Sequence, residues 1–402
     1  MVQFLNLMHM KGKGAVVPPE LKGRLDTDVL RKTQDYEREK TYFGFASSVF
    51  GNILVIVFIF GGPLNAYNSW IASLSLPFVL SGWLFFMLLF FAGEFLSVPF
   101  SIYETFNVEN LFGFNTTTPK LWVMDFIKSL LISTVLMSAA IVAGLWLIRW
   151  VPDYWWLMVW GFLLLFSTFI MYISPYAIEP LFNKFTPVED ETLREKIVAL
   201  AQKAGIRASR VLRVDASRRS RHTNAYFTGI GKTKRIILYD TLMEGMTHEE
   251  ILAVLAHEIG HWKKRHLLKG MVLLEVLSLV ALYCSSRLTQ GDFLLSLFRV
   301  GQDTFFAKVI LLVFLGGILS KLLGPLMNSL SRKNEREADR ASYELTGDAG
   351  SMVQVFAKLS RENLANLYPH PLYVTLYYSH PPVLERIRAI TEMGEISGRE
   401  LR

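Results

Sequence analysis

The chain has 402 residues, of which 51% are hydrophobic and only 19% are charged. This composition is too apolar for an ordinary soluble enzyme of this length, so it favours a membrane protein. The formal charge of +7 does not indicate nucleic-acid binding, because Lys and Arg gather in three polar regions. The single cysteine, Cys284, excludes an intrachain disulfide and a multi-cysteine zinc site.

Apolar runs along the chain predict six membrane spans, since a helix needs about 20 mostly apolar residues to cross a bilayer. The predicted spans are 43–62, 71–93, 130–148, 154–173, 267–283 and 309–327. The last two are interrupted by Lys269, Glu275 and Lys321, and buried helices of a soluble domain are the alternative for them. We therefore expect a mainly α-helical polytopic membrane protein.

The three basic regions are residues 1–42, 179–266 and 328–402. Positively charged loops stay on the cytoplasmic side, and an even number of spans places all three regions there. The loop at 94–120 then also faces the cytoplasm. These boundaries predict a cytoplasmic N-terminal segment (1–42), four spans (43–178), the first half of a soluble domain (179–266), two spans (267–327) and the second half (328–402).

The polar stretch 179–266 is long enough to fold as an α+β unit. Apolar spacing predicts a helix at 192–204, and the pattern of residues 210–215 predicts a strand. Residues 224–240 are typical of two strands joined by a glycine-containing turn. Thr247 and Glu250 form a capping-box pattern, which begins a helix that we expect to continue into the fifth span.

That helix carries the most informative motif, L-A-H-E-I-G-H-W. His257 and His261 are four residues apart, so both imidazoles lie on one face of the helix. Two imidazoles can bind one zinc ion, which activates a water molecule, and Glu258 lies beside them to accept a proton. The sequence therefore predicts a catalytic site with one zinc ion per chain.

A third protein ligand is expected beyond the last two spans, in S-R-K-N-E-R-E-A-D-R. Glu335 and Asp339 share a helical face, which makes Glu335 the candidate ligand and Asp339 a carboxylate that supports a zinc histidine. Ala338 would permit close packing, and Glu337 is expected to take no part in zinc binding. The remaining histidines nearby, His248 and His266, are interpreted as solvated residues at helix ends.

The chain resembles the CAAX prenyl protease 1 family of integral-membrane zinc metalloendopeptidases. The matching segments run from residue 17 to residue 386 and follow the family's order: V-P-P-E-L, P-L-F-N-K-F-T-P, S-R-H-T-N-A-Y-F-T-G, K-R-I-I-L-Y-D-T-L, L-A-H-E-I-G-H-W, N-E-R-E-A-D and Y-S-H-P-P-V-L-E-R. The H-E-x-x-H motif alone is shared by many zinc proteases, whereas this combination is highly specific.

The resemblance implies further site residues and an architecture. It places Asn224 beside the scissile peptide, His380 near the metal as a stabiliser of the oxyanion, and Arg386 at another family position. It implies a helix barrel around a chamber, capped by a split α+β zincin-like protease domain. It also implies C-terminal CAAX substrates cut after a prenylated cysteine. The family usually has seven spans, the first before V-P-P-E-L, so we expect either that this chain lacks the first span or that the true start lies upstream.

We therefore expect a membrane zinc endopeptidase that acts on peptide or protein substrates in contact with the lipid bilayer. No nucleic-acid partner is expected, and the protein is expected to be a monomer. Its active site should face the cytoplasm from a bacterial inner membrane or a eukaryotic endoplasmic-reticulum membrane. A quality-control membrane protease is one alternative, although the four leading spans argue against it. A channel or transporter with a structural metal is another, but a structural zinc site needs four protein ligands.

Overall fold

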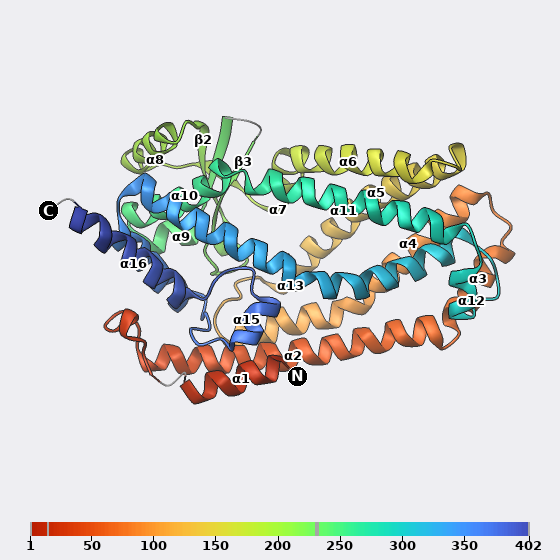
Figure 1. Cartoon of the computed structure of the whole chain (residues 1–402), viewed down its shortest axis with the longest axis horizontal. Helices are drawn as coiled ribbons and strands as arrows, with labels where there is room; N and C mark the ends of the chain where they lie inside the picture. Colours follow the sequence, from red (N-terminus) through yellow and green to blue (C-terminus); the bar gives the residue numbers. More distant parts are fainter. Residues whose placement is uncertain (1, 14–15, 230–232, 401–402) are drawn as a thin grey trace.

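The computed structural model describes residues 2–13, 16–229 and 233–400. The described chain is mostly helical, with one small sheet (Figure 1). Long helices run from the sheet end of the molecule to an opposite end, where the short helices α3 and α12 lie (Figure 1). The predicted fold class, a helical polytopic protein with an α+β domain, is confirmed.

The helices before the sheet are α1 (Val2–Lys13), η1 (Pro19–Leu21), α2 (Thr27–Phe60), α3 (Pro63–Ser73), α4 (Phe78–Tyr103), η2 (Glu104–Glu109), α5 (Pro119–Trp150), α6 (Trp155–Ile173), η3 (Ser174–Ile178) and α7 (Glu179–Phe182). The α+β segment contains β1 (Phe185–Pro187), α8 (Glu191–Lys203), β2 (Arg207–Val214), η4 (Ala216–Arg218), β3 (Ala225–Thr228), β4 (Thr233–Tyr239), α9 (Asp240–Gly245) and α10 (His248–Lys263). The remaining helices are α11 (His266–Thr289), α12 (Phe293–Phe298), α13 (Phe305–Thr346), α14 (Ala349–Glu362), α15 (Pro371–Tyr377) and α16 (Val383–Glu400).

Six helical segments in the described part of the chain are long and apolar enough to cross a membrane. They are Thr27–Phe60, Phe78–Glu109, Pro119–Trp150, Trp155–Phe182, His266–Thr289 and Phe305–Thr346. In the most apolar stretch of α11 no residue is buried, as lipid-facing side chains require. The count of six agrees with the sequence prediction. The second predicted span began too early, because Ser75 (φ 50°) and Pro77 separate α3 from α4.

One long helix, α13, contains the last candidate span and continues to the end of the molecule where the sheet lies (Figure 1). It runs unbroken for 42 residues and contains Pro325 near its midpoint. A proline inside a helix removes one backbone donor and bends the axis, and the ribbon of α13 bends near its middle (Figure 1).

The predicted continuous helix from the H-E-x-x-H motif into the fifth span is not found. The chain is broken between α10 and α11 at Arg265, which has a left-handed backbone conformation (φ 56°). Neither glycine nor proline marks this break, so sequence patterning gave no signal for it.

The sheet has the strand order β1-β2-β4-β3. Strands β2 and β4 are parallel, while β1 pairs with β2 and β3 with β4 in antiparallel fashion. Strand β3 therefore lies at an edge of the sheet and packs near α10. Its companion β4 is buried, with Ile236, Ile237 and Leu238 fully enclosed.

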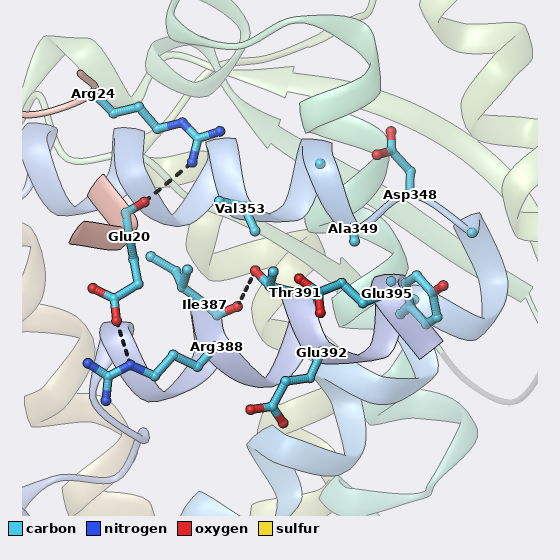
Figure 2. Close-up of a pocket in the computed structure, with 14 residues that line it drawn as sticks. Glu20, Arg24, Asp348, Ala349, Val353, Ile387, Arg388, Thr391, Glu392 and Glu395 are labelled. Atoms are coloured by element: carbon cyan, nitrogen blue, oxygen red, sulfur yellow. Dashed lines mark hydrogen bonds and ion pairs between the residues drawn. The ribbon is translucent and has the colours of Figure 1, made fainter. Parts of the chain in front are cut away.

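The V-P-P-E-L segment is attached to the last helix. Leu21 is fully buried in the core of the α+β domain, and the Glu20 carboxylate forms an ion pair with Arg388 of α16. Figure 2 shows this ion pair at the wall of a cavity of about 790 Å³, which is also lined by Asp348 and Glu392. None of the predicted site residues lines this cavity.

The loop between α4 and α5 is bound to the α+β domain. The Arg219 guanidinium donates to both carboxylate oxygens of Asp125 in α5, over 2.7 and 3.1 Å. The Thr116 hydroxyl donates to the Ser217 carbonyl at 2.7 Å. The Tyr368 hydroxyl donates to the Val16 carbonyl, and one buried core contains Leu21, Ile236 and Val353, so the first, middle and last basic regions meet at this end of the molecule.

Candidate metal centre

Helix α10 begins with the predicted capping box. The Glu250 backbone N–H donates to the Thr247 hydroxyl at 3.3 Å, and the Thr247 N–H donates to the Glu250 carboxylate at 2.7 Å. These bonds satisfy two backbone donors at the start of the helix. They fix the residue at which α10 begins, and the four-residue spacing places His257 and His261 on one face of the helix.

Helices α10 and α13 approach each other closely at Gly260. A Cβ atom at this position would lie 2.9 Å from the Ala338 carbonyl oxygen and 3.0 Å from its Cα. Ala338 is itself fully buried, as expected for a close contact between the two helices. The two small residues allow α13 to bring its carboxylates to the histidines of α10.

The two histidines and Glu335 converge on one point. The Nε2 atoms of His257 and His261 are 3.1 Å apart. Glu335 places Oε1 3.2 Å from His261 Nε2 and Oε2 3.4 Å from His257 Nε2. Glu335 is buried, with an exposed fraction of 5%.

This geometry fits a metal ion. Zinc with ligands at about 2.0–2.2 Å in tetrahedral geometry has ligand atoms about 3.3–3.6 Å apart, close to the separations here. The three residues form a group of ligand atoms that all lie within 4.8 Å of one another. Glu335 Oε2 is buried without a hydrogen bond. A cation would satisfy this atom and the two facing imidazole nitrogens together.

Asp339 and Arg386 support this group from behind. Asp339 Oδ1 lies 2.8 Å from His257 Nδ1, the nitrogen that faces away from Glu335. Arg386 of α16 donates to both oxygens of Asp339, at 2.8 and 2.6 Å, and its guanidinium stacks over Phe356. Removing one partner from such a buried charged pair costs about 3–5 kcal/mol.

The site alters the proton affinity of two residues on α10. Burial raises the pKa of the Glu258 carboxyl above its usual value, although His257 and His261 oppose this shift. Burial disfavours protonated His257, but its contacts with Asp339 and Glu335 outweigh burial and raise the pKa of His257 to about 9. The raised pKa of the Glu258 carboxyl suits a group that must take up a proton near neutral pH.

His380 and Asn224 have different relations to the group. His380 places Nε2 3.4 Å from Glu335 Oε1, and its side chain is 61% exposed, so it stands at the open side. Asn224 is exposed and lies directly before edge strand β3, where its side-chain oxygen accepts from the Ala225 N–H. Among the residues described by the structure, no hydrogen bond joins the Asn224 side chain to the metal-binding group.

The interpretation of His266 as a solvated residue was wrong. His266 is buried, with Nδ1 3.0 Å from His261 Nδ1 and Nε2 3.2 Å from Glu337 Oε2. The break at Arg265 turns the chain so that His266 returns to His261. Glu337 is therefore connected to the site. His248 lies at the helix start as expected, but is partly shielded and contacts Asp190 at 2.9 Å.

The six apolar helices and the His-His-Glu group define a multi-pass membrane metallopeptidase. Residues 6–184 match the family described as CAAX prenyl protease N-terminal, five membrane helices, and residues 187–394 match Peptidase family M48. The chain therefore belongs to peptidase family M48, with a CAAX prenyl protease N-terminal region. The resemblance inferred from the motifs is confirmed, and the chain is a membrane metalloendopeptidase.

Individual relatives cover almost the whole chain. The CAAX prenyl protease 1 homolog of Arabidopsis thaliana is 33% identical, covering 96% of this chain and 93% of the relative. CAAX prenyl protease 1 of Saccharomyces cerevisiae is 32% identical, with coverages of 94% and 89%. The crystal structure of S. mikatae Ste24p superposes with a TM-score of 0.89 at 29% identity, covering 97% of this chain and 94% of that one.

Proposed function

We propose that the metal is zinc, bound by His257, His261 and Glu335, and that this centre hydrolyses C-terminal CAAX substrates after a prenylated cysteine. The observation that carries the proposal is the convergence of two Nε2 atoms and one carboxylate within 3.1–3.4 Å. The relatives named as CAAX prenyl proteases support the substrate class.

Each protein group has a role that its position supports. A bound zinc ion would polarise the scissile carbonyl and lower the pKa of a water molecule to about 7. Glu258 accepts a proton from the attacking water and then donates one to the leaving amine. His380, at the open side, donates a hydrogen bond to the oxyanion. Asp339 holds the His257 ring, and Arg386 holds Asp339.

The substrate is proposed to bind as an extended chain along the edge of the sheet. Strand β3 offers a free edge in the described part of the sheet, and Asn224 stands at its start. Edge pairing supplies main-chain hydrogen bonds to an extended peptide. Asn224 would then bind the backbone beside the scissile bond.

We further propose that the site faces the cytoplasm and that the chain works as a monomer. The three basic regions lie at the same end as the metal-binding group, which the tendency of positive loops to remain cytoplasmic supports. A transporter with a structural metal is the competing function. A closed structural zinc site has four protein ligands, and the described residues supply a group of three.

The test is cleavage of one CAAX peptide in farnesylated and unprenylated forms by the purified protein. We expect cleavage of the farnesylated form, loss of activity with a chelator, and recovery with zinc. Equal cleavage of both forms would contradict the need for prenylation while leaving the peptidase assignment in place. Zinc-dependent transport without cleavage would favour the competing function.

A further inference from the structure

His266 is a buried polar side chain for which the proposed reaction has no use. Its exposed fraction is 6%, although it is the first residue of an apolar helix. It touches His261 on one side and Glu337 on the other, at 3.0 and 3.2 Å. A buried imidazole with both nitrogens engaged connects the metal-binding group to a carboxylate on α13.

The chemistry of these groups fixes the direction of each hydrogen bond. An ionised carboxylate only accepts, so the proton of neutral His266 must be on Nε2, facing Glu337. Nδ1 of His266 is then unprotonated and accepts a hydrogen bond from Nδ1–H of His261. That leaves the lone pair of His261 on Nε2, the atom that faces Glu335.

We infer that His266 and Glu337 form a positioning pair, which holds His261 in the tautomer and ring orientation that binds the metal. The inference rests on the proposed metal site. With this pair, each of the two proposed zinc histidines is oriented by a different carboxylate of α13. Asp339 contacts His257 directly, whereas Glu337 acts on His261 through His266. Partners of this kind orient metal-binding histidines, and their loss costs about 10- to 100-fold in metal affinity.

The geometry also explains why a histidine is needed between Glu337 and His261. Helix α11 begins directly after the break at Arg265 and packs against α13. His266 therefore lies between the end of α10 and Glu337 on α13. In the series of contacts from His261 through His266 to Glu337, the Glu337 side chain is 34% exposed, whereas the His266 side chain is almost fully buried.

The experiment measures the zinc dissociation constant of metal-free protein by competition with a chromophoric chelator. His266→Phe keeps a ring but removes both nitrogens, and Glu337→Ala removes the terminal acceptor. We expect each to weaken zinc binding about 10- to 100-fold. His266→Asn keeps an amide oxygen near the place of Nδ1, so we expect it to recover part of that affinity. If the phenylalanine variant does not fold, the zinc affinity of Glu337→Ala decides by itself.

The matched control is Glu344→Ala, on the same helix. Glu344 pairs with Arg340 at the surface, at 3.1 Å, and its side chain is 58% exposed. We expect its zinc affinity to stay within twofold of the parent. The thermal midpoint of each metal-free variant separates positioning from general stability, because a purely structural role would lower the midpoint and leave zinc affinity unchanged.

Two outcomes would overturn the inference, and they differ in reach. Parent-like zinc affinity in both His266→Phe and Glu337→Ala would remove the positioning pair but leave the proposed zinc site intact. Failure of the parent itself to bind one zinc per chain would remove the proposed site, and the inference with it. Cobalt substitution adds a spectroscopic check, since loss of one imidazole ligand would change the visible absorption of the bound ion.

Discussion

Glu258 is the residue whose role is most separable from metal binding. It lies one position after His257, and the three proposed ligands do not include it. We predict that Glu258→Gln keeps one zinc per chain while lowering kcat by at least about 10²–10⁴-fold, because the proton acceptor is lost. Metal analysis and a peptide-cleavage assay on the same preparation check both parts. Near-normal turnover in this variant would remove Glu258 from the mechanism.

His257 predicts how the proposed site responds to pH. Its pKa is raised to about 9 in the metal-free protein, so the ring is protonated at pH 7. A metal must displace this proton, and we expect zinc binding at pH 7 to release about one proton. Affinity should then fall about tenfold per pH unit below the pKa and level off above it. Calorimetry in two buffers of different ionisation enthalpy counts the protons, and a count of zero would contradict this prediction.

Helix packing at Gly260 decides whether the proposed ligands meet. A methyl group there would collide with backbone atoms of Ala338, which cannot move without shifting α13. We predict that Gly260→Ala destabilises the protein by about 1–3 kcal/mol and weakens zinc binding. Thermal unfolding and zinc titration measure the two effects.

The matched control for this substitution is Gly270→Ala in α11. A Cβ at Gly270 would meet nothing within 4 Å, and alanine is favoured over glycine in a helix by about 0.5–1 kcal/mol. We expect this control to match or slightly exceed the parent in stability and to keep the parent zinc affinity. Similar behaviour of the two variants would show that the close approach at Gly260 does not matter.

Elements with strong local signals were predictable from the sequence. The capping box at Thr247 and the strands β3 and β4 follow from patterns within a few residues, and the spans follow from continuous apolar runs. The convergence of Glu335 with His257 and His261 was also anticipated, because equal four-residue spacing places each pair on one helical face.

The missed features depend on tertiary structure. Arg265 adopts its left-handed conformation without a local signal, and this turn alone brings His266 to His261. A histidine at the start of an apolar helix is usually solvated, so nothing in its neighbourhood distinguishes His266. Likewise, Glu337 lies in a run of charged residues, and only the position of α11 against α13 gives it a partner.

At the scale of the whole molecule, charged residues within the spans indicate where the water-filled chamber implied by the family resemblance would lie. Glu275 and Lys321 form no ion pair with each other among the residues that the structure describes, and Lys321 is exposed. A charge at the centre of a span costs about 2.5–3.5 kcal/mol if it faces lipid, so we predict that Lys321 faces water.

Cysteine labelling tests this prediction in a Cys284→Ser background. We expect Lys321→Cys to react with a water-soluble thiol reagent in folded, active protein. Leu322→Cys is the control, because the side chain of Leu322 points about 100° away from that of Lys321 around the helix. We expect this control to react less. Absence of labelling at position 321 would argue against a water-filled chamber beside this part of α13.

The central claim is that one zinc ion held between α10 and α13 performs the hydrolysis. The most direct measurement is a zinc titration of metal-free protein that follows bound metal and cleavage of a farnesylated CAAX peptide together. We predict that activity rises in proportion to bound zinc, reaches its plateau at one ion per chain, and is absent in Glu335→Ala. Cleavage by protein without zinc, or full activity in Glu335→Ala, would contradict the account.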